Sequence, residues 1–188
     1  MKKYSPTKIN STSPGFTLLE MLFAVIIFSF ALISLMGIAS KGVIATATAR
    51  DQLTAQYLAE EALETARNTR DSNFLGYQAS VDWMTDIDQC IPTSPCYVDN
   101  SGTVPRLVSC GGLCQNRYLY ENEGVFSTQA VPGSDGPTTF SQELYVEKVG
   151  VNLSQRKAVA TVRWKQKAFD RTFTVQTYLS DWQSPTTP

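Results

Sequence analysis

The stretch that decides the fold lies at residues 13–41 and reads SPGFTLLEMLFAVIIFSFALISLMGIASK. Between Glu20 and Lys41 no residue carries a charge. At about 1.5 Å of rise per residue, a helix over this run spans about 30 Å, which is the thickness of the hydrocarbon core of a bilayer. The sequence therefore predicts a membrane-spanning helix half at residues 16–40. The run is longer than the apolar core of a cleaved signal peptide, so an uncleaved signal anchor is the simpler alternative.

The residues in front of this segment form a polar leader, 1–15, which contains Lys2, Lys3 and Lys8 and no acid. Under the positive-inside rule these lysines hold the N-terminus in the cytoplasm, so the rest of the chain lies outside. Glu20 needs a separate explanation, because a carboxylate in a membrane helix costs about 2.5–3.5 kcal/mol. The helix dipole offsets only about 0.3–1 kcal/mol of this. A positive amine alongside would offset more.

The segment Ser13-Pro14-Gly15-Phe16-Thr17-Leu18-Leu19-Glu20 resembles the prepilin signature of type IV pilins and of the pseudopilins of type II secretion. The resemblance implies cleavage between Gly15 and Phe16 by a prepilin peptidase and N-methylation of Phe16. It also implies that Glu20 pairs with the terminal amine of a neighbouring subunit during assembly. The implied partners are other pilin subunits in a helical filament, the peptidase/methyltransferase and the inner-membrane assembly machinery.

An amphipathic helix half is predicted at 41–70, in a helix that runs from Phe16 to Arg70. Apolar residues recur there with helical spacing on one stripe: Ala55, Leu58, Ala59, Ala62, Leu63 and Ala66. We expect this stripe to pack on the chain's own globular head, at residues 71–182, with a loose tail at 183–188. The segment that starts at Ala55 also resembles the same stretch of minor pilins.

The head contains cysteine-bearing loops, with Cys90 and Cys96 in one cluster and Cys110 and Cys114 in another. Four cysteines admit three pairings, and the sequence does not choose among them. Disulfides are the favoured interpretation because the head lies outside the membrane. A zinc site that uses all four thiolates is the alternative, although the spacing differs from the usual paired C-x2-C.

Strand patterns follow the cysteine region and are clearest at the C-terminal end. Alternating apolar residues predict strands at 158–164 and 171–179, joined as a hairpin by residues 167–170, and a third strand at 140–149. Shorter strands are predicted at 117–120 and 125–128. The expected fold class is therefore α+β, with a long N-terminal helix packed on a C-terminal antiparallel sheet, as in pilins.

Basic residues gather on one predicted strand, where Arg163, Lys165 and Lys167 alternate and so project from one face. A solvated sheet face is the simplest interpretation of this row. We prefer a charged interface that meets an acidic surface on a neighbouring subunit. A DNA-binding stripe is the less favoured alternative, because no aromatic ladder accompanies the bases.

The composition narrows the function further. The 188 residues include no histidine and give a formal charge of −1, which excludes Ser-His-Asp and Cys-His chemistry and disfavours a dedicated nucleic-acid binder. We expect no enzyme activity, no cofactor and no metal. The favoured function is a minor or accessory structural subunit of a type IV pilus, made as an inner-membrane precursor and then moved to the cell surface. The alternatives are a secretion pseudopilin, in a periplasmic pseudopilus, and a signal-anchored extracellular binding domain.

Overall fold

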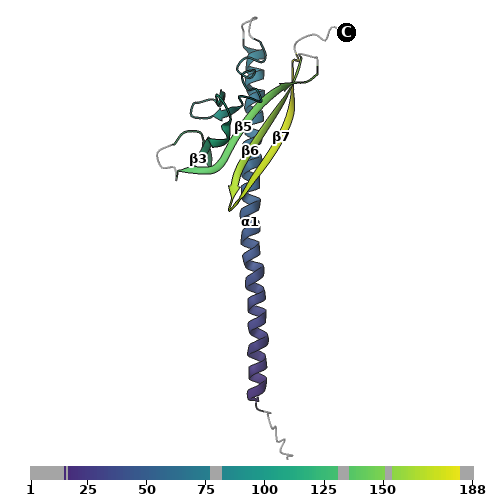
Figure 1. The fold of residues 1–188 in the computed structure, drawn as a ribbon, viewed down its shortest axis with the longest axis vertical. Helices are drawn as coiled ribbons and strands as arrows, with labels where there is room; N and C mark the ends of the chain where they lie inside the picture. The colour runs from purple at the N-terminus through teal and green to yellow at the C-terminus, as the bar shows by residue number, and fades with distance from the viewer. Residues whose placement is uncertain (1–14, 16, 77–81, 131–135, 151–153, 183–188) are drawn as a thin grey trace, which may run out of the picture. The chain divides into compact units, whose positions relative to one another are not determined.

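The computed structural model of the chain describes residues 15, 17–76, 82–130, 136–150 and 154–182 (Figure 1). The chain divides into two compact units, Met1–Ala47 and Thr48–Pro188. Helix α1 (Leu18–Leu75) provides the helix of the first unit and also the first element of the second. The prediction of one long N-terminal helix is confirmed. The helix ends at Leu75, five residues beyond the predicted end at Arg70.

In the first unit, α1 begins with a side-chain cap. The hydroxyl of Thr17 accepts a hydrogen bond from the backbone N–H of Glu20 at 3.2 Å, and the Thr17 carbonyl accepts one from the N–H of Met21 at 3.2 Å. Further along, the hydroxyls of Ser29 and Ser34 donate to the carbonyls four residues earlier, at 2.7 and 3.0 Å. These serines are therefore satisfied within the helix, which makes them tolerable in an apolar segment.

In the second unit, α1 buries the predicted apolar stripe completely. The stripe that periodicity predicted is confirmed, and all six of its residues are buried: Ala55, Leu58, Ala59, Ala62, Leu63 and Ala66. The alanines have no side chain beyond Cβ, so the helix backbone approaches the sheet closely along this line. Thr65 is also buried, and its hydroxyl donates to the carbonyl of Glu61 at 2.8 Å.

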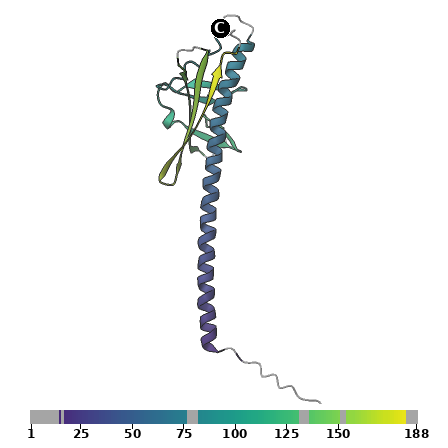
Figure 2. The same cartoon turned by 90° about the vertical axis from the view of Figure 1, so that its right-hand side faces the viewer.

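The second unit contains a seven-stranded sheet in which every pairing is antiparallel. Its strands are β1 (Cys96–Asp99), β2 (Arg106–Ser109), β3 (Tyr118–Asn122), β4 (Val125–Ser127), β5 (Pro137–Lys148), β6 (Gln155–Gln166) and β7 (Phe169–Ser180). Strand β5 pairs with β6 along one edge and with both β1 and β3 along the other, and β7 pairs with β6. Figure 2 shows β5, β6 and β7 lying alongside α1.

The core of the second unit lies between the α1 stripe and one face of β5 and β6. On β6 this face carries Ala158, Ala160, Val162 and Trp164, all buried. On β5 the same face includes Gln142, whose amide donates to the Leu58 carbonyl of α1 and whose oxygen accepts from the N–H of Val98 at 3.3 Å. A buried amide thus joins helix and sheet without leaving either backbone group unsatisfied. The coarse prediction of an α+β fold is confirmed.

The predicted strand boundaries need correction at their ends. The C-terminal hairpin is confirmed, but its connection is the two-residue turn Lys167-Ala168 rather than residues 167–170, because the ladder continues to the pair Gln166–Phe169. Strand β5 ends at Lys148 and begins at Pro137, earlier than predicted. The sequence did not predict β1 and β2, which are four residues each.

Candidate functional site

The N-terminal candidate site combines the residues of the predicted cleavage motif with the start of α1. Gly15 is exposed, Phe16 lies outside the described residues, and Glu20 is exposed in the first turn of α1. Sequence reasoning missed the role of Thr17, whose hydroxyl caps this turn. The signal was present as the spacing Thr17-x-x-Glu20, which is that of a capping box. The motif therefore also has a local role in starting the helix.

The helix that follows presents apolar side chains on all of its sides. Every described side chain from Thr17 to Ala47 is exposed within its unit, including Phe23, Phe28 and Phe30. The helix is long and apolar enough to cross a membrane, with a mean hydropathy of 2.6 over its most apolar window. Moving one large apolar side chain out of water gains roughly 1.5–3 kcal/mol. This segment therefore needs lipid or other apolar helices around it.

The predicted basic row is only partly formed. Arg163 lies on β6, but its guanidinium pairs with the buried carboxylate of Glu143 on β5 at 2.6 Å. Lys165 is exposed near the end of β6, and Lys167 lies beyond the strand in the turn, with a φ of 56°. The prediction that the three bases share one strand face is therefore wrong for Lys167, because β6 ends at Gln166. The charged interface itself stays a prediction.

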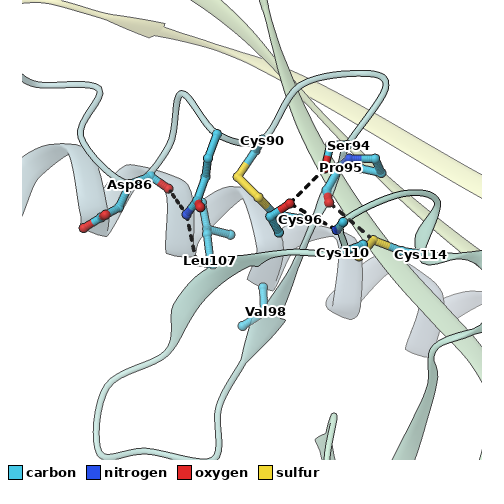
Figure 3. Close-up of a disulfide and its surroundings, with 12 residues drawn as sticks. Asp86, Cys90, Ser94, Pro95, Cys96, Val98, Leu107, Cys110 and Cys114 are labelled. Carbon is cyan, nitrogen blue, oxygen red and sulfur yellow. Dashed lines mark hydrogen bonds between the residues drawn. A yellow bond between two sulfur atoms is a disulfide. The ribbon is translucent and has the colours of Figure 1, made fainter.

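The cysteines pair within their clusters, Cys90 with Cys96 and Cys110 with Cys114 (Figure 3). The sequence had left three pairings open, and the structure selects the two short loops. Disulfide bonding of all four sulfurs leaves no thiolate for the alternative zinc site. The preference for disulfides is confirmed.

The first disulfide loop is attached directly to the central sheet. The Cys90 carbonyl accepts a hydrogen bond from the N–H of Val146 at 2.6 Å, and Cys96 pairs with Leu144 of the same strand, β5. The second loop is built on the first, because the N–H of Cys110 donates to the Pro95 carbonyl at 2.9 Å (Figure 3). The two loops and the strands between them, residues 90–114, are called the disulfide insert below.

An ion pair closes the far end of the disulfide insert. Asp99 and Arg106 are cross-strand partners of β1 and β2, and the guanidinium lies 3.1 Å from the carboxylate. Hydrogen bonds from Ser101 hold the pKa of the Asp99 carboxyl below its ordinary value, and Arg106 adds to this effect. The insert thus keeps its fold through two covalent links and a buried carboxylate.

A groove of about 600 Å³ lies between α1 and β7. Its acidic residues are engaged: Glu60 accepts from Gln56 at 2.9 Å and Glu64 pairs with Arg67 at 3.2 Å. Burial raises the pKa of the Glu61 carboxyl above its ordinary value, while hydrogen bonds from the side chains of Asn100 and Gln142 act in the opposite direction. The groove is an acidic surface whose carboxylates are held by neighbouring side chains.

Three exposed acids, Asp82, Asp86 and Asp88, lie close together in the turns between α1 and β1. Asp82 accepts a hydrogen bond from the N–H of Met84 at 3.0 Å, as a turn-forming aspartate does. Asp86 adopts a φ of 66°, and its carbonyl accepts from the Gln89 amide at 2.9 Å. Asp88 is exposed in the same turn. The Asp82 carboxylate therefore has a structural role in its turn.

Comparison of the chain with protein-family models, with curated proteins and with solved structures gave no match. The structure supports a membrane-competent apolar helix and an antiparallel sheet unit that carries disulfides. The assignment of function therefore rests on the chain's own residues.

Proposed function

We propose that the chain is the precursor of a structural subunit, minor or accessory, of a type IV pilus or pilus-like filament. The observation that carries the proposal is the helix behind Gly15, which exposes apolar side chains all round from Leu18 to Ile44. A helix of this kind is stable in a bilayer or packed among copies of itself. A pilus precursor would occupy the bilayer first, and the assembled subunit would then pack among identical helices in the filament core. The subunit does no chemistry of its own.

The motif residues support the processing steps of this proposal. Cleavage after Gly15 would remove the three lysines of the leader and place a new amine at Phe16, four residues from Glu20. Glu20 is exposed and begins the membrane segment, where an unpaired carboxylate is unfavourable. The terminal amine of a neighbouring subunit and Glu20 would satisfy each other, so assembly would relieve both charges.

The disulfide insert supports an accessory role in the filament. It adds β1 and β2 to the free edge of β5 and is held by two disulfides. A covalently braced surface of this kind is suited to conditions outside the cell. The precursor would be a single-pass protein of the cytoplasmic membrane with its second unit outside. The processed subunit would then enter a surface pilus or, as the alternative, a periplasmic pseudopilus.

The test is mass spectrometry on surface filaments sheared from native cells, together with the variant Glu20→Gln. We expect an N-terminal peptide that begins at methylated Phe16 in the filament fraction. We expect Glu20→Gln to be processed at Gly15 normally but to fall at least about tenfold in filaments, since a buried unpaired amine costs several kcal/mol. The control is Glu123→Gln, which alters an exposed glutamate in the turn between β3 and β4, outside the acidic groove, and should assemble normally.

The contrary result is a chain that keeps Met1, is found only in membranes and tolerates Glu20→Gln. That result would favour the signal-anchored binding domain, because an anchor needs neither a processed terminus nor a paired Glu20. The abundance of the Phe16 peptide relative to the most abundant filament subunit separates an accessory subunit from a major one.

A further inference from the structure

The turn between β6 and β7 forms a basic and exposed end of the second unit. Lys165, Lys167 and Arg171 are all exposed there, with Asp170 as the one acid among residues 165–171. No hydrogen bond or ion pair engages these three bases within the described part of the chain. Phe169, beside them, is 69% exposed although it is a large aromatic residue. We call residues 165–171 the basic turn.

The position of the basic turn is fixed by a contact with α1. The Gln166 amide donates to the hydroxyl of Thr48 at 2.8 Å. Thr48 lies seven residues after Lys41, the charge that ends the uncharged run. The basic turn is therefore attached to a residue of the second unit that follows the uncharged run closely along the chain, and Figure 1 shows the turn between β6 and β7 at one end of the sheet.

We propose that the basic turn docks on the anionic phospholipid headgroups of the membrane that holds α1. This inference rests on the proposed membrane insertion of residues 16–40. Lysine and arginine side chains near a membrane attract anionic lipids, and their aliphatic stems lie along the apolar boundary. Phe169 supplies the apolar side chain that enters the interface, as aromatic residues do in peripheral membrane segments.

The chemistry of this end fits a lipid surface better than a second copy of the chain. A protein partner with matching acids would be expected to bind Arg163 as well, but that guanidinium already pairs with Glu143. On a second copy of the chain, the acidic groove would offer these bases carboxylates that already accept a hydrogen bond from Gln56 or pair with Arg67 within their own chain. A lipid surface can bind the basic side chains and the phenyl ring without requiring a fixed arrangement of these groups. The docked turn would hold the second unit against the membrane before the subunit enters a filament.

The experiment uses the full chain in lipid nanodiscs, with a fluorophore attached through Ala168→Cys. Ala168 is exposed at the tip of the turn, and the native cysteines are all in disulfides, so the new thiol alone reacts. The discs contain phosphatidylcholine alone or a 7:3 mixture with phosphatidylglycerol, each with a small amount of a quencher-bearing lipid. Protein incorporation is first checked by resistance to alkaline extraction.

We expect at least about twofold stronger quenching in the anionic discs, and its loss in 1 M NaCl, where the Debye length is about 3 Å. The double variant Lys165→Gln, Lys167→Gln should lose the lipid dependence, on the order of tenfold in the docked-to-free ratio. The matched control is Arg117→Gln, Lys148→Gln, which removes two exposed bases away from the turn and should behave like the wild type.

Two results would overturn the inference and leave the insertion of α1 intact: quenching that is equal in both lipids, or equal loss in both double variants. Protection of the label by a second copy, seen as lipid-independent cross-linking, would also reject it in favour of a subunit contact. A chain that fails to resist extraction would overturn membrane insertion itself, and the docking inference with it.

Discussion

The packing of Glu61 on α1 against the sheet makes the stability of the second unit depend on pH. Its carboxyl is half-buried beside the sheet, and burial raises its pKa above the ordinary value. The folded state therefore binds this proton more tightly than the unfolded state does. Linkage then requires that stability falls as pH rises from the ordinary pKa of the carboxyl through its raised value.

We expect Glu61→Gln to remove this part of the pH dependence. The variant should raise the free energy of unfolding at pH 7, because the amide is neutral and still accepts the hydrogen bond of Gln142. The measurement is urea unfolding in detergent micelles between pH 4.5 and pH 8, followed by tryptophan fluorescence. A variant whose stability falls with pH as steeply as that of the wild type would contradict the assignment.

Single residues also mark the limit of sequence reasoning. Glu20 and the four cysteines could be selected from the sequence because a carboxylate in an apolar run and clustered cysteines are rare local patterns. The pairing of Arg163 with Glu143 could not be predicted from the sequence, because the two residues lie on different strands and are brought together only by the register of β5 and β6. Strand register depends on the whole sheet, so the sequence around either residue does not determine it.

Among the elements, the disulfide insert depends most on its covalent links. The chain closed by Cys90–Cys96 has a sequence separation of 6 and that closed by Cys110–Cys114 one of 4. Loops of these lengths give nearly equal entropic stabilisation, about 2 kcal/mol each. The sulfurs of the first pair are fully buried in the core, whereas Cys110 is half-buried.

We therefore expect Cys90→Ala, Cys96→Ala to destabilise the second unit more than Cys110→Ala, Cys114→Ala does. The second double variant should lose about 2 kcal/mol in the free energy of unfolding. The first should lose more, because the contact of the Cys90 carbonyl with Val146 also depends on the loop. Denaturant unfolding of both variants under one condition provides the comparison, and equal losses would show that the two loops contribute alike.

Elements with a clear period could be predicted from the sequence, and short elements could not. Strands β6 and β7 alternate over many residues, and α1 repeats its apolar stripe at helical spacing, so their kind and partner were predictable. Strands β1 and β2 have four residues each, too few for a period to show. Strand β1 joins the sheet through the pairing of Cys96 with Leu144 of β5, and β2 joins through β1, so both depend on contacts between residues far apart in the sequence.

At the scale of the whole chain, the two units draw on different sources of stability. The second unit has its own core between α1 and the sheet, whereas the described side chains of the first unit are all exposed. Residues on the same helix should therefore differ in what they contribute to folding. Leu58 is buried in the core and Leu32 is exposed in the apolar segment.

We expect Leu58→Ala to lower the free energy of unfolding of the second unit by about 2–5 kcal/mol, as buried leucines usually do. The identical change at Leu32 should leave that value unchanged within error. The three tryptophans of the chain, Trp83, Trp164 and Trp182, all lie in the second unit and report its unfolding in micelles. A loss at Leu32 as large as that at Leu58 would mean that the two units unfold together.

The fold class, and the division of the chain into an apolar helix segment and a sheet-containing unit, could be predicted from the sequence because they follow from hydrophobic periodicity and segment length. The filament role remains a proposal, because partners outside the chain decide it. The basic turn was visible only in part. Its basic residues can be identified from the sequence. Its attachment to α1 cannot, because it depends on a hydrogen bond between Gln166 and Thr48, which are 118 positions apart.

The serines of the apolar helix have a mechanical consequence. Ser29 and Ser34 direct their hydroxyls to their own helix, so they offer neighbours no free donor. Helices that meet through such surfaces are held by shape and dispersion, without directional bonds that must break before one helix slides along another. In the filament proposed above, a bundle of these helices under tension would lengthen by small slips between equivalent packings and would recover when the load is removed, as an elastic cable does.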